Sequence, residues 1–375
     1  MKIYLAGKTP DELVNIAKEE GLPGFAGKQI AQWLYGKRAR SLEQMTNLSK
    51  AAREKLGEKY DTGISEPIDV QTSADGTRKY LFPVLRDFST PLEMTSLSSR
   101  PSEARGEICV EAVMIPDHDR KTLCVSSQAG CKMGCKFCMT GRQGFHGNLT
   151  VTDILSQFFA VDEAADLTNA VFMGMGEPLD NWENVKSAID VLTADWGFGW
   201  SPKRITLSTI GVLPNLKRYL DESRCHLAVS LHNPFPEERL QMMPVQKAWP
   251  LQDVINLIKQ YDFTGQRRVS FEYTVFDGWN NTPRHAKELV RLLRGLECRV
   301  NLIRFHRIPD FPYGPAPATA MEDFKDMLER GGLTATIRAS RGEDIFAACG
   351  LLAGKHKEIP GQARNEDGGA RNEEL

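Results

Sequence analysis

The sequence lacks the features of a membrane-bound or exported protein. No run of residues approaches the roughly 20 consecutive apolar side chains that a membrane-spanning helix requires. The N-terminal stretch has no long apolar core of the kind found in a signal peptide. We therefore expect a cytoplasmic protein that has no membrane partner.

The chain also lacks a strong net charge and a disulfide framework. Its 47 lysines and arginines nearly balance its 49 aspartates and glutamates, which leaves a net charge of -2. A nucleic-acid partner would therefore be held by local basic patches rather than by the charge of the whole protein. The eight cysteines are mostly not arranged in pairs, which fits a reducing compartment.

Three of the cysteines are closely spaced. Cys131, Cys135 and Cys138 form a CxxxCxxC pattern. Thiolates suit iron–sulfur clusters and zinc, but structural zinc usually takes four ligands in two separated pairs, and no fourth ligand is obvious here. A 4Fe–4S cluster held by three thiolates keeps one iron open, and that iron can chelate the amino and carboxylate groups of S-adenosylmethionine (SAM). Phe137 would shield such a cluster from solvent. Three buried structural thiols, or a zinc knuckle, are the alternatives.

From residue 122 onward, the sequence alternates between apolar strand-like runs and helix-like stretches. Strands are expected near residues 123–126, 170–173, 205–208, 227–231, 269–275 and 300–303, and helices at 151–163, 182–192, 212–220, 251–259, 283–293 and 320–329. Six such units favour an α/β fold with a parallel sheet and right-handed crossovers, built as a partial or complete barrel. The cysteine motif follows the first strand, at the end where such barrels carry their active-site loops.

Composition divides the chain into four segments. Residues 1–65 are predicted to form a small helical domain, 66–121 a strand-rich connecting segment, 122–354 the barrel and 355–375 a disordered tail. Asp75-Gly76 is a hairpin signal, and the polar residues 88–105 are expected to form a mobile loop. The helical domain carries a basic group: Lys28, Lys37, Arg38, Arg40, Lys50 and Arg53. This group indicates either an ordinary solvated surface or a face that docks on RNA.

Polar residues follow several of the expected strands. The glycines of Gly174-Met175-Gly176-Glu177 can make a tight turn, and Glu177 could receive the ammonium group of a bound amino acid. The other polar strand ends are Ser208, Ser230-Leu231-His232 and His306. A lone serine or histidine is usually a satisfied structural residue. Because these strand ends lie on the same side as the cysteine loop, we expect them to outline a polar pocket.

The remaining five cysteines are scattered. Buried, inert thiols are the default interpretation, and it is kept for Cys109, Cys225 and Cys298. Cys124 lies inside the first barrel strand, and Cys349 lies beyond the sheet in Ala347-Ala348-Cys349-Gly350.

Together these motifs resemble the RlmN family of radical-SAM RNA methyltransferases. The resemblance covers roughly residues 10–354 and rests on Glu111, Cys124-x6-Cys131-x3-Cys135-x2-Cys138, Gly174-x-Gly176-Glu177-Pro178, Ser230-Leu231-His232 and Ala347-Ala348-Cys349-Gly350. Two features depart from the family pattern. Residues 88–105 look longer than the usual connection, and His306 stands where the family more often has asparagine.

The resemblance implies a partial radical-SAM (β/α)6 barrel with a small helical N-terminal domain that binds RNA. It implies methylation of carbon 2 of an adenine at the peptidyl-transferase centre of 23S rRNA, and also of the adenine beside the anticodon in some tRNAs. One 4Fe–4S cluster would be held by Cys131, Cys135 and Cys138, and two SAM molecules would be used per turnover. SAM would be bound by Gly176, Glu177, Ser208, Ser230, Leu231, His232 and His306. An external one-electron donor such as flavodoxin is implied, and we expect a monomer.

The resemblance also assigns chemical roles to three residues. Cys349 would take a methyl group from a first SAM, and a 5′-deoxyadenosyl radical from a second would remove a hydrogen atom from that methyl. The methylene radical would add to adenine. Cys124 would then help to remove the carbon 2 proton and close a transient disulfide with Cys349, which requires Cα atoms within about 7 Å. Glu111 would be a proton acceptor tuned by burial.

Three alternatives remain open at this point. The sister Cfr family shares most of these motifs and methylates carbon 8 of the same adenine. A radical-SAM enzyme could act on a peptide or small molecule, but it would need neither Cys349 nor the helical N-terminal domain. A non-catalytic RNA-binding protein with a structural metal would bind zinc and would not consume SAM.

Overall fold

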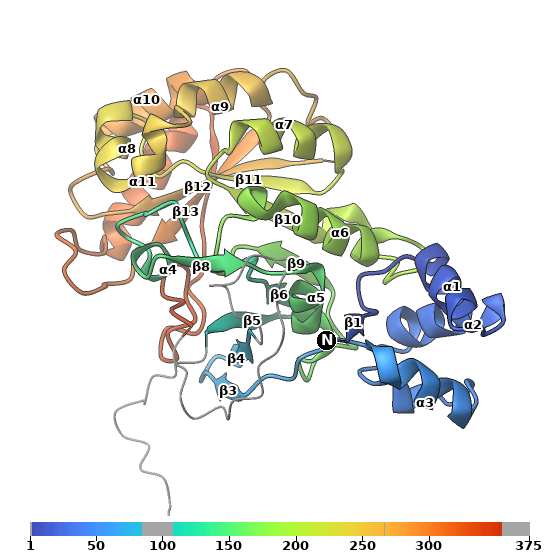
Figure 1. Ribbon diagram of the computed structural model, residues 1–375. Coiled ribbons are helices and arrows are strands. Elements are labelled where there is room, and N and C mark those ends of the chain that lie inside the picture. Colours follow the sequence, from blue (N-terminus) through green and yellow to red (C-terminus); the bar gives the residue numbers. More distant parts are fainter. Residues whose placement is uncertain (1, 85–107, 266, 355–375) are drawn as a thin grey trace, which may run out of the picture.

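The computed structural model describes residues 2–84, 108–265 and 267–354 (Figure 1). The polar loop expected at residues 88–105 and the disordered tail expected at residues 355–375 lie outside these ranges. No helix of the described ranges combines the length and the apolar character needed to cross a membrane.

A ten-stranded sheet runs through the centre of the protein in the order β14-β13-β12-β11-β10-β9-β6-β5-β4-β3 (Figure 1). Its parallel part consists of β6 (Arg120–Cys124), β9 (Asn169–Phe172), β10 (Ile205–Thr209), β11 (His226–Ser230), β12 (Val269–Val275), β13 (Cys298–Arg304) and β14 (Thr334–Ile337). The six expected barrel strands are confirmed. The short segment expected after them adds a seventh parallel strand, β14, beside β13.

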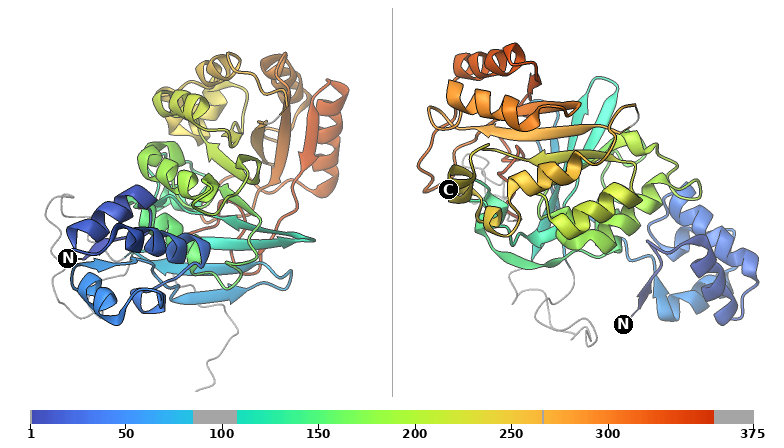
Figure 2. Two further views of the ribbon diagram at one scale, coloured as in Figure 1. Left: turned by 90° about the vertical axis from the view of Figure 1, so that its right-hand side faces the viewer. Right: turned by 90° about the horizontal axis from the view of Figure 1, so that it is seen from above.

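Helices cover the outer side of the parallel strands (Figure 2). They are α5 (Val151–Phe159), α6 (Trp182–Thr193), α7 (Leu213–Glu222), α8 (Pro236–Met242), α9 (Leu251–Ile258), α10 (Pro283–Leu293) and α11 (Ala318–Arg330). Six of these were expected, and the short α8 was not. Strand β12 shows why the two faces differ: Tyr273 packs on Phe324 of α11, with ring centres 5.5 Å apart, whereas Glu272 and Thr274 line an inner pocket.

The strand-rich segment continues this sheet rather than forming a separate layer. Strands β3 (Asp69–Thr72), β4 (Arg78–Pro83) and β5 (Cys109–Asp117) pair antiparallel, and β5 pairs antiparallel with β6 of the barrel. The hairpin predicted at Asp75-Gly76 joins β3 to β4, with Gly76 at a φ of 82°. The first barrel strand is therefore supported on both sides.

The N-terminal residues form a small helical unit at one end of the molecule (Figure 1). It contains β1 (Ile3–Tyr4), α1 (Pro10–Glu19), α2 (Gly24–Ala31), a π-helical turn (Gln32–Gly36), a 3-10 turn (Leu42–Gln44), α3 (Lys50–Lys59) and β2 (Tyr60–Asp61), which pairs parallel with β1. Thr9 and Glu12 form the expected cap of α1. Tyr35 packs edge-on against Trp196, with ring centres 5.2 Å apart, so the helical unit contacts the barrel directly.

A two-stranded ribbon that sequence reasoning did not predict holds the cysteine motif. Strands β7 (Gln128–Gly130) and β8 (Phe145–Asn148) pair antiparallel, and the motif and helix α4 (Met139–Arg142) lie between them. Gly130 has a φ of 76°, and a Cβ there would lie 2.0 Å from the Gly144 carbonyl oxygen. Glycine is therefore required where the two ends of the cysteine loop meet.

Candidate active site

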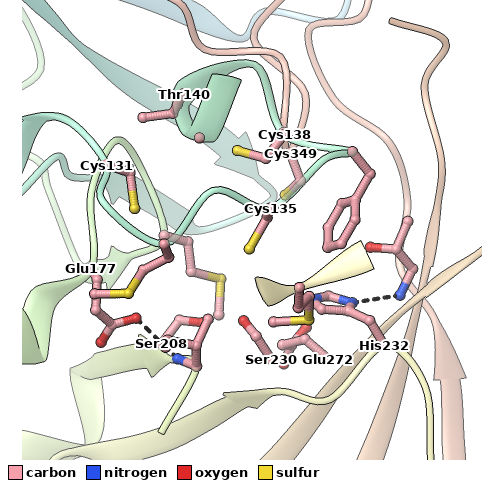
Figure 3. Close-up of a pocket in the computed structure, with 18 of the residues that line it drawn as sticks. Cys131, Cys135, Cys138, Thr140, Glu177, Ser208, Ser230, His232, Glu272 and Cys349 are labelled. Carbon is pink, nitrogen blue, oxygen red and sulfur yellow. Dashed lines mark hydrogen bonds between the residues drawn. The ribbon is translucent and has the colours of Figure 1, made fainter. Parts of the chain in front are cut away.

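The carboxyl ends of the parallel strands surround one pocket (Figure 3). The pocket has a volume of about 980 Å³ out to its open mouth. Its wall includes Cys131, Cys135, Cys138, Gly176, Glu177, Ser208, Ser230, His232, Glu272 and Cys349. The expectation that the cysteine loop and the polar strand ends share one pocket is therefore confirmed for Glu177, Ser208, Ser230 and His232, but not for His306, which lines a second pocket. Their contacts with a cluster or with SAM stay predictions at this stage.

Backbone hydrogen bonds fix the cysteine loop, and burial disfavours the charged form of its thiols. Cys131 N–H donates to the Gly144 carbonyl at 2.8 Å, and Lys136 N–H donates to the Met242 carbonyl at 3.0 Å. Burial raises the pKa of the Cys131 thiol to about 12 and lifts the pKa of Cys135 well above its ordinary range. Thiols in such surroundings keep their protons unless a metal ion takes the place of the proton.

The three thiols suit a cluster better than a single ion. Within the described ranges, no three side chains of the histidine, cysteine, aspartate or glutamate types converge as one metal ion would need. Thiolates that share one zinc lie about 4 Å apart, given Zn–S bonds of about 2.3 Å. A cubane cluster places each thiolate on its own iron, so the three thiols need not converge on one ion.

Glu177 is a buried carboxylate on the pocket wall, drawn below Cys131 in Figure 3. It accepts hydrogen bonds from Thr209 Oγ1 at 2.6 Å and from the backbone N–H of Ile210 at 3.0 Å. Burial nevertheless raises its pKa to about 7. Gly176 brings the chain close to β7, since a Cβ there would lie 2.5 Å from Gln128 Cβ. A bound ammonium group would compensate the charge of Glu177, which fits the binding of an amino acid.

His232 directs one ring nitrogen to the backbone and leaves the other for the pocket. Its φ of 56° is rare for a residue with a side chain, and the N–H of Thr274 donates to its Nδ1 at 3.0 Å. Burial and the nearby Arg239 lower its pKa to about 3, so the neutral ring carries its hydrogen on Nε2. The Phe137 ring packs edge-on against it, with ring centres 4.9 Å apart. The predicted shield, Phe137, is itself only 8% exposed.

Cys349 is carried over the pocket by a loop that follows β14. Gly350 accepts a 2.8 Å hydrogen bond from Met139 N–H, which ties this loop to the residue after Cys138. Cys124 on β6 is buried, and burial raises its pKa to about 12, with a further contribution from Cys349. The two thiols are therefore close enough to interact electrostatically. All eight cysteines are free thiols in this structure, so the disulfide between Cys124 and Cys349 stays a prediction.

A second pocket lies on the other side of Cys349. Its volume is about 1660 Å³ out to solvent. Its wall carries six cationic residues, Arg120, Lys203, Arg204, Arg268, Arg338 and Arg341, with Asp117 as its one carboxylate among the described residues. Cys349 lines both pockets. Such a basic cavity favours a polyanionic ligand.

Comparisons with known proteins match both parts of the chain. Residues 125–293 match the Radical SAM superfamily, and residues 3–61 match the ribosomal RNA large subunit methyltransferase N-terminal domain. The probable dual-specificity RNA methyltransferase RlmN of Porphyromonas gingivalis is 56% identical over 352 residues, which cover 94% of each chain. The chain belongs to the RlmN family.

More distant RlmN relatives and a solved structure agree with this assignment. The dual-specificity RNA methyltransferase RlmN of Syntrophus aciditrophicus is 39% identical over 361 residues, covering 95% of this chain and 98% of that protein. The crystal structure of a radical SAM methyltransferase from Sphaerobacter thermophilus is 35% identical and superposes with a TM-score of 0.85, covering 94% of this chain and all of that one. The fold is therefore the radical-SAM fold expected from the sequence.

Four site residues that the RlmN resemblance implies are absent from the described wall of the first pocket: Cys124, which is buried in β6, and Leu231, His306 and Glu111. Leu231 is fully buried, and its backbone bonds to Glu272 and Arg239 instead. His306 lines the basic pocket, where its Nε2 lies 3.1 Å from Ser340 Oγ. Glu111 lies under the Cys349 loop and forms an ion pair with Lys79. The roles proposed for these residues stay predictions.

Three charged residues near the RlmN motifs, of which Glu272 and Arg239 are buried, were not found from the sequence. Glu272 lines the first pocket and accepts from Asn301 Nδ2 at 2.7 Å. Arg338 lies 3.5 Å from Glu272. Burial acts to lower the pKa of Arg338, but the nearby Cys349 and Glu272 outweigh it and raise that pKa. Arg239 donates to the carbonyls of Ser230 and Leu231, both at 3.0 Å. Of the three, only Glu272 could have been found from the sequence, because polar and apolar residues alternate along Val269–Val275 and place its side chain on the inner face of the strand.

Proposed function

We propose that this protein is a radical-SAM methyltransferase that methylates carbon 2 of an adenine in 23S rRNA, with tRNA as a second substrate. The observation that carries the proposal is the position of Cys349 on the walls of both pockets. One pocket has the three thiols and the buried carboxylate that suit a cluster and SAM. The other has the positive charge that suits RNA. A methyl group carried on Cys349 would pass from the first pocket to the second.

Residues of the first pocket would hold the cofactors. Cys131, Cys135 and Cys138 would bind one 4Fe–4S cluster, and Glu177 would bind the ammonium group of SAM. Ser208, Ser230, His232 and the backbone at Gly176 line the same pocket and would contact the rest of SAM, whereas His306 and Leu231 would act from outside it. With cluster and SAM bound, the site supplies a methyl group and the radical chemistry that removes one hydrogen atom from it, using two SAM molecules per turnover.

The chain's own residues would carry the transfer. The Cys349 thiolate takes the methyl group and is held beside the cysteine loop by the bond from Met139 to Gly350. Cys124 keeps its proton at rest because burial raises its pKa to about 12. It would act only after the carbon has joined the base, by helping to remove the carbon 2 proton. The Cys124 thiolate would then attack Cys349 Sγ and form a disulfide. The bond from Cys349 Sγ to the transferred carbon would break, and that carbon would take up a proton and leave on the base as a methyl group. Glu111 would accept a proton once the loop above it has moved.

The RNA would approach through the basic pocket. Arginines and lysines there would hold phosphate groups, and the target adenine must leave its stack to reach Cys349. Residues 1–65 would act as a separate RNA-binding domain, as the match to the N-terminal methyltransferase domain supports. The protein would work as a cytoplasmic monomer with an external one-electron donor such as flavodoxin.

Nucleoside analysis tests the proposal. The iron-reconstituted protein is incubated without oxygen with SAM, a one-electron reductant and 23S rRNA fragments or tRNA, and the digested RNA is analysed by mass spectrometry. We expect 2-methyladenosine from both substrates and none from the Cys349→Ala variant. Formation of 8-methyladenosine would assign the protein to the Cfr-type reaction instead. SAM cleavage without any methylated RNA would contradict the proposal.

A further inference from the structure

A buried ion pair lies beneath the loop that carries Cys349. Lys79 Nζ lies 3.1 Å from Glu111 Oε1, and the two side chains are only 7% and 2% exposed. The residues come from neighbouring strands, β4 and β5, where Leu81 faces Glu111 and Lys79 faces Val113. Lys79 is therefore the diagonal neighbour of Glu111 on the same face of the sheet, within reach of its long side chain.

The second carboxylate oxygen of Glu111 binds the end of the Cys349 loop. Oε2 accepts hydrogen bonds from the backbone N–H of Ala353 at 2.6 Å and from that of Gly354 at 2.9 Å. Gly354 approaches the sheet closely, since a Cβ there would lie 2.4 Å from the Cys109 carbonyl oxygen. One carboxylate thus joins the sheet to the loop through two charge-assisted hydrogen bonds.

The other side of the same loop is bound to the cysteine motif. Met139 N–H donates to the Gly350 carbonyl at 2.8 Å, and Thr140 Oγ1 donates to the Leu352 carbonyl at 2.8 Å. Both donors belong to α4, which begins directly after Cys138. Gln143, which follows α4, also donates to the Ala353 carbonyl. The segment after Cys349 is therefore bound on one side to α4 and Gln143 and on the other side to Glu111.

We propose that Lys79 and Glu111 form a latch that holds the Cys349 loop in its position above the first pocket, with Lys79 as a positioning residue. Its importance for catalysis rests on the proposed function, but the latch itself does not. Lys79 provides the countercharge for the buried Glu111 carboxylate, which bonds to both backbone N–H groups of the loop. Without Lys79, a buried carboxylate would lack its ion-pair partner, and the loop would loosen.

In this proposal, Glu111 binds the loop and accepts a proton at different times. In this structure both oxygens of Glu111 are engaged, Oε1 by Lys79 and Oε2 by the loop. While Oε2 holds Ala353 and Gly354, that oxygen has no lone pair left for a proton from a substrate base. Movement of the loop frees Oε2, and Lys79 continues to balance the charge. Loop release and proton acceptance would therefore occur in the same step.

Hydrogen exchange at the amides of Ala353 and Gly354 tests the latch in the full-length protein. Lys79→Met keeps the length of the side chain and removes its charge. We expect exchange of these two amides to become about tenfold faster, the effect of losing roughly one net hydrogen bond. Cys349 should also react faster with iodoacetamide. Lys79→Arg, which restores the charge, should return both rates to within about threefold of the parent protein.

Lys121→Met is the matched control, because Lys121 also pairs with a carboxylate, Asp166 at 2.7 Å, but on the exposed surface of β6. It should leave both rates unchanged. Parental exchange rates in a folded Lys79→Met protein would overturn the latch, as would equal acceleration in Lys121→Met.

A double variant covers the case in which Lys79→Met does not fold. Lys79→Met/Glu111→Gln leaves neither charge buried, so its stability should recover. Its neutral amide should still bind the loop more weakly than the carboxylate, and exchange at Ala353 and Gly354 should exceed the parental rate. Parental protection in this variant would overturn the proposal. Because none of these rates requires RNA methylation, loss of the proposed function would leave the latch testable by itself.

Discussion

The thiols of Cys124 and Cys349 lie within electrostatic reach of each other, so that a charge on Cys349 raises the pKa of Cys124. The two residues come from opposite ends of the barrel domain, one from β6 and one from the loop after β14. Only the folded sheet brings them together. This pairing is the structural basis of the proposed division of work between a methyl carrier and a second thiol that releases the product.

Removal of each thiol should therefore stop the reaction at a different step. Cys349→Ala should never become methylated and should leave RNA unmodified, with activity reduced at least a thousandfold. Cys124→Ala should carry out the early steps and then accumulate a protein–RNA adduct through Cys349, seen as a slow gel band that RNase shortens. Cys225→Ala, which removes another buried thiol, is the control. An adduct that forms equally well in Cys349→Ala would refute the assignment.

The cysteine loop should bind iron only as a complete set. Replacement of Cys131, Cys135 or Cys138 by alanine should abolish iron binding and SAM cleavage, because each thiolate serves a separate iron. Iron and sulfide analysis of the reconstituted variants gives the measurement. Cys298→Ala should keep the parental iron content. Full iron content in the three single variants would contradict the cluster.

Glu177 should make stability depend on pH in the protein without cofactors. Burial raises its pKa from the ordinary 4.5 to about 7, so the folded protein binds more protons than the unfolded chain between these values. Stability must then fall as pH rises through this window, by about 3 kcal/mol in total for this group. Urea unfolding should show this loss in the parent protein and not in Glu177→Gln, with Glu183→Gln as the surface control. The same pH dependence in Glu177→Gln would contradict the burial argument.

The exposed lysines of the N-terminal helices should contribute to RNA affinity through phosphate contacts. We expect the triple variant Lys28→Ala/Lys37→Ala/Lys50→Ala to bind substrate RNA more weakly and to lower the slope of log affinity against log salt by about two to three. A matched variant removes Lys186, Lys217 and Lys325, which pair with neighbouring carboxylates on barrel helices. Equal slopes for the two triple variants would indicate that the N-terminal lysines only solvate the surface.

The barrel could be predicted from the sequence because its signals are local. Each strand is a short apolar run, and each helix has an apolar stripe, so the alternation appears without any knowledge of distant contacts. The pocket followed from the same pattern, since polar residues at the carboxyl ends of parallel strands must meet at one edge. The spacing of the cysteine motif favoured a cluster over zinc, and the resemblance to the RlmN family named the cluster and SAM.

The parts that could not be predicted depend on distant contacts. The role of Lys79 could not be predicted from the sequence, because it depends on the ion pair with Glu111. That pair is known only once the structure places Glu111 diagonally across from Lys79 on the neighbouring strand. The basic pocket is assembled from β6, from the segments before β10 and β12, and from the loop after β14, none of which is conspicuously basic by itself. The resemblance placed His306 with SAM. Its ring lies in the basic pocket beside Ser340, which the sequence could not show because Ser340 is 34 residues away, and its contact with SAM stays a prediction.

The central claim is that Cys349 carries the carbon that reaches RNA, and isotope transfer tests it most directly. The parent protein is first loaded on Cys349 with a CD3 group, freed of labelled SAM, and then given unlabelled SAM, a reductant and RNA for a single turnover. Since one hydrogen atom must leave the carried methyl before it can join the base, the account predicts methyladenosine that retains two deuterium atoms. Unlabelled product, or product with all three deuterium atoms, would contradict it.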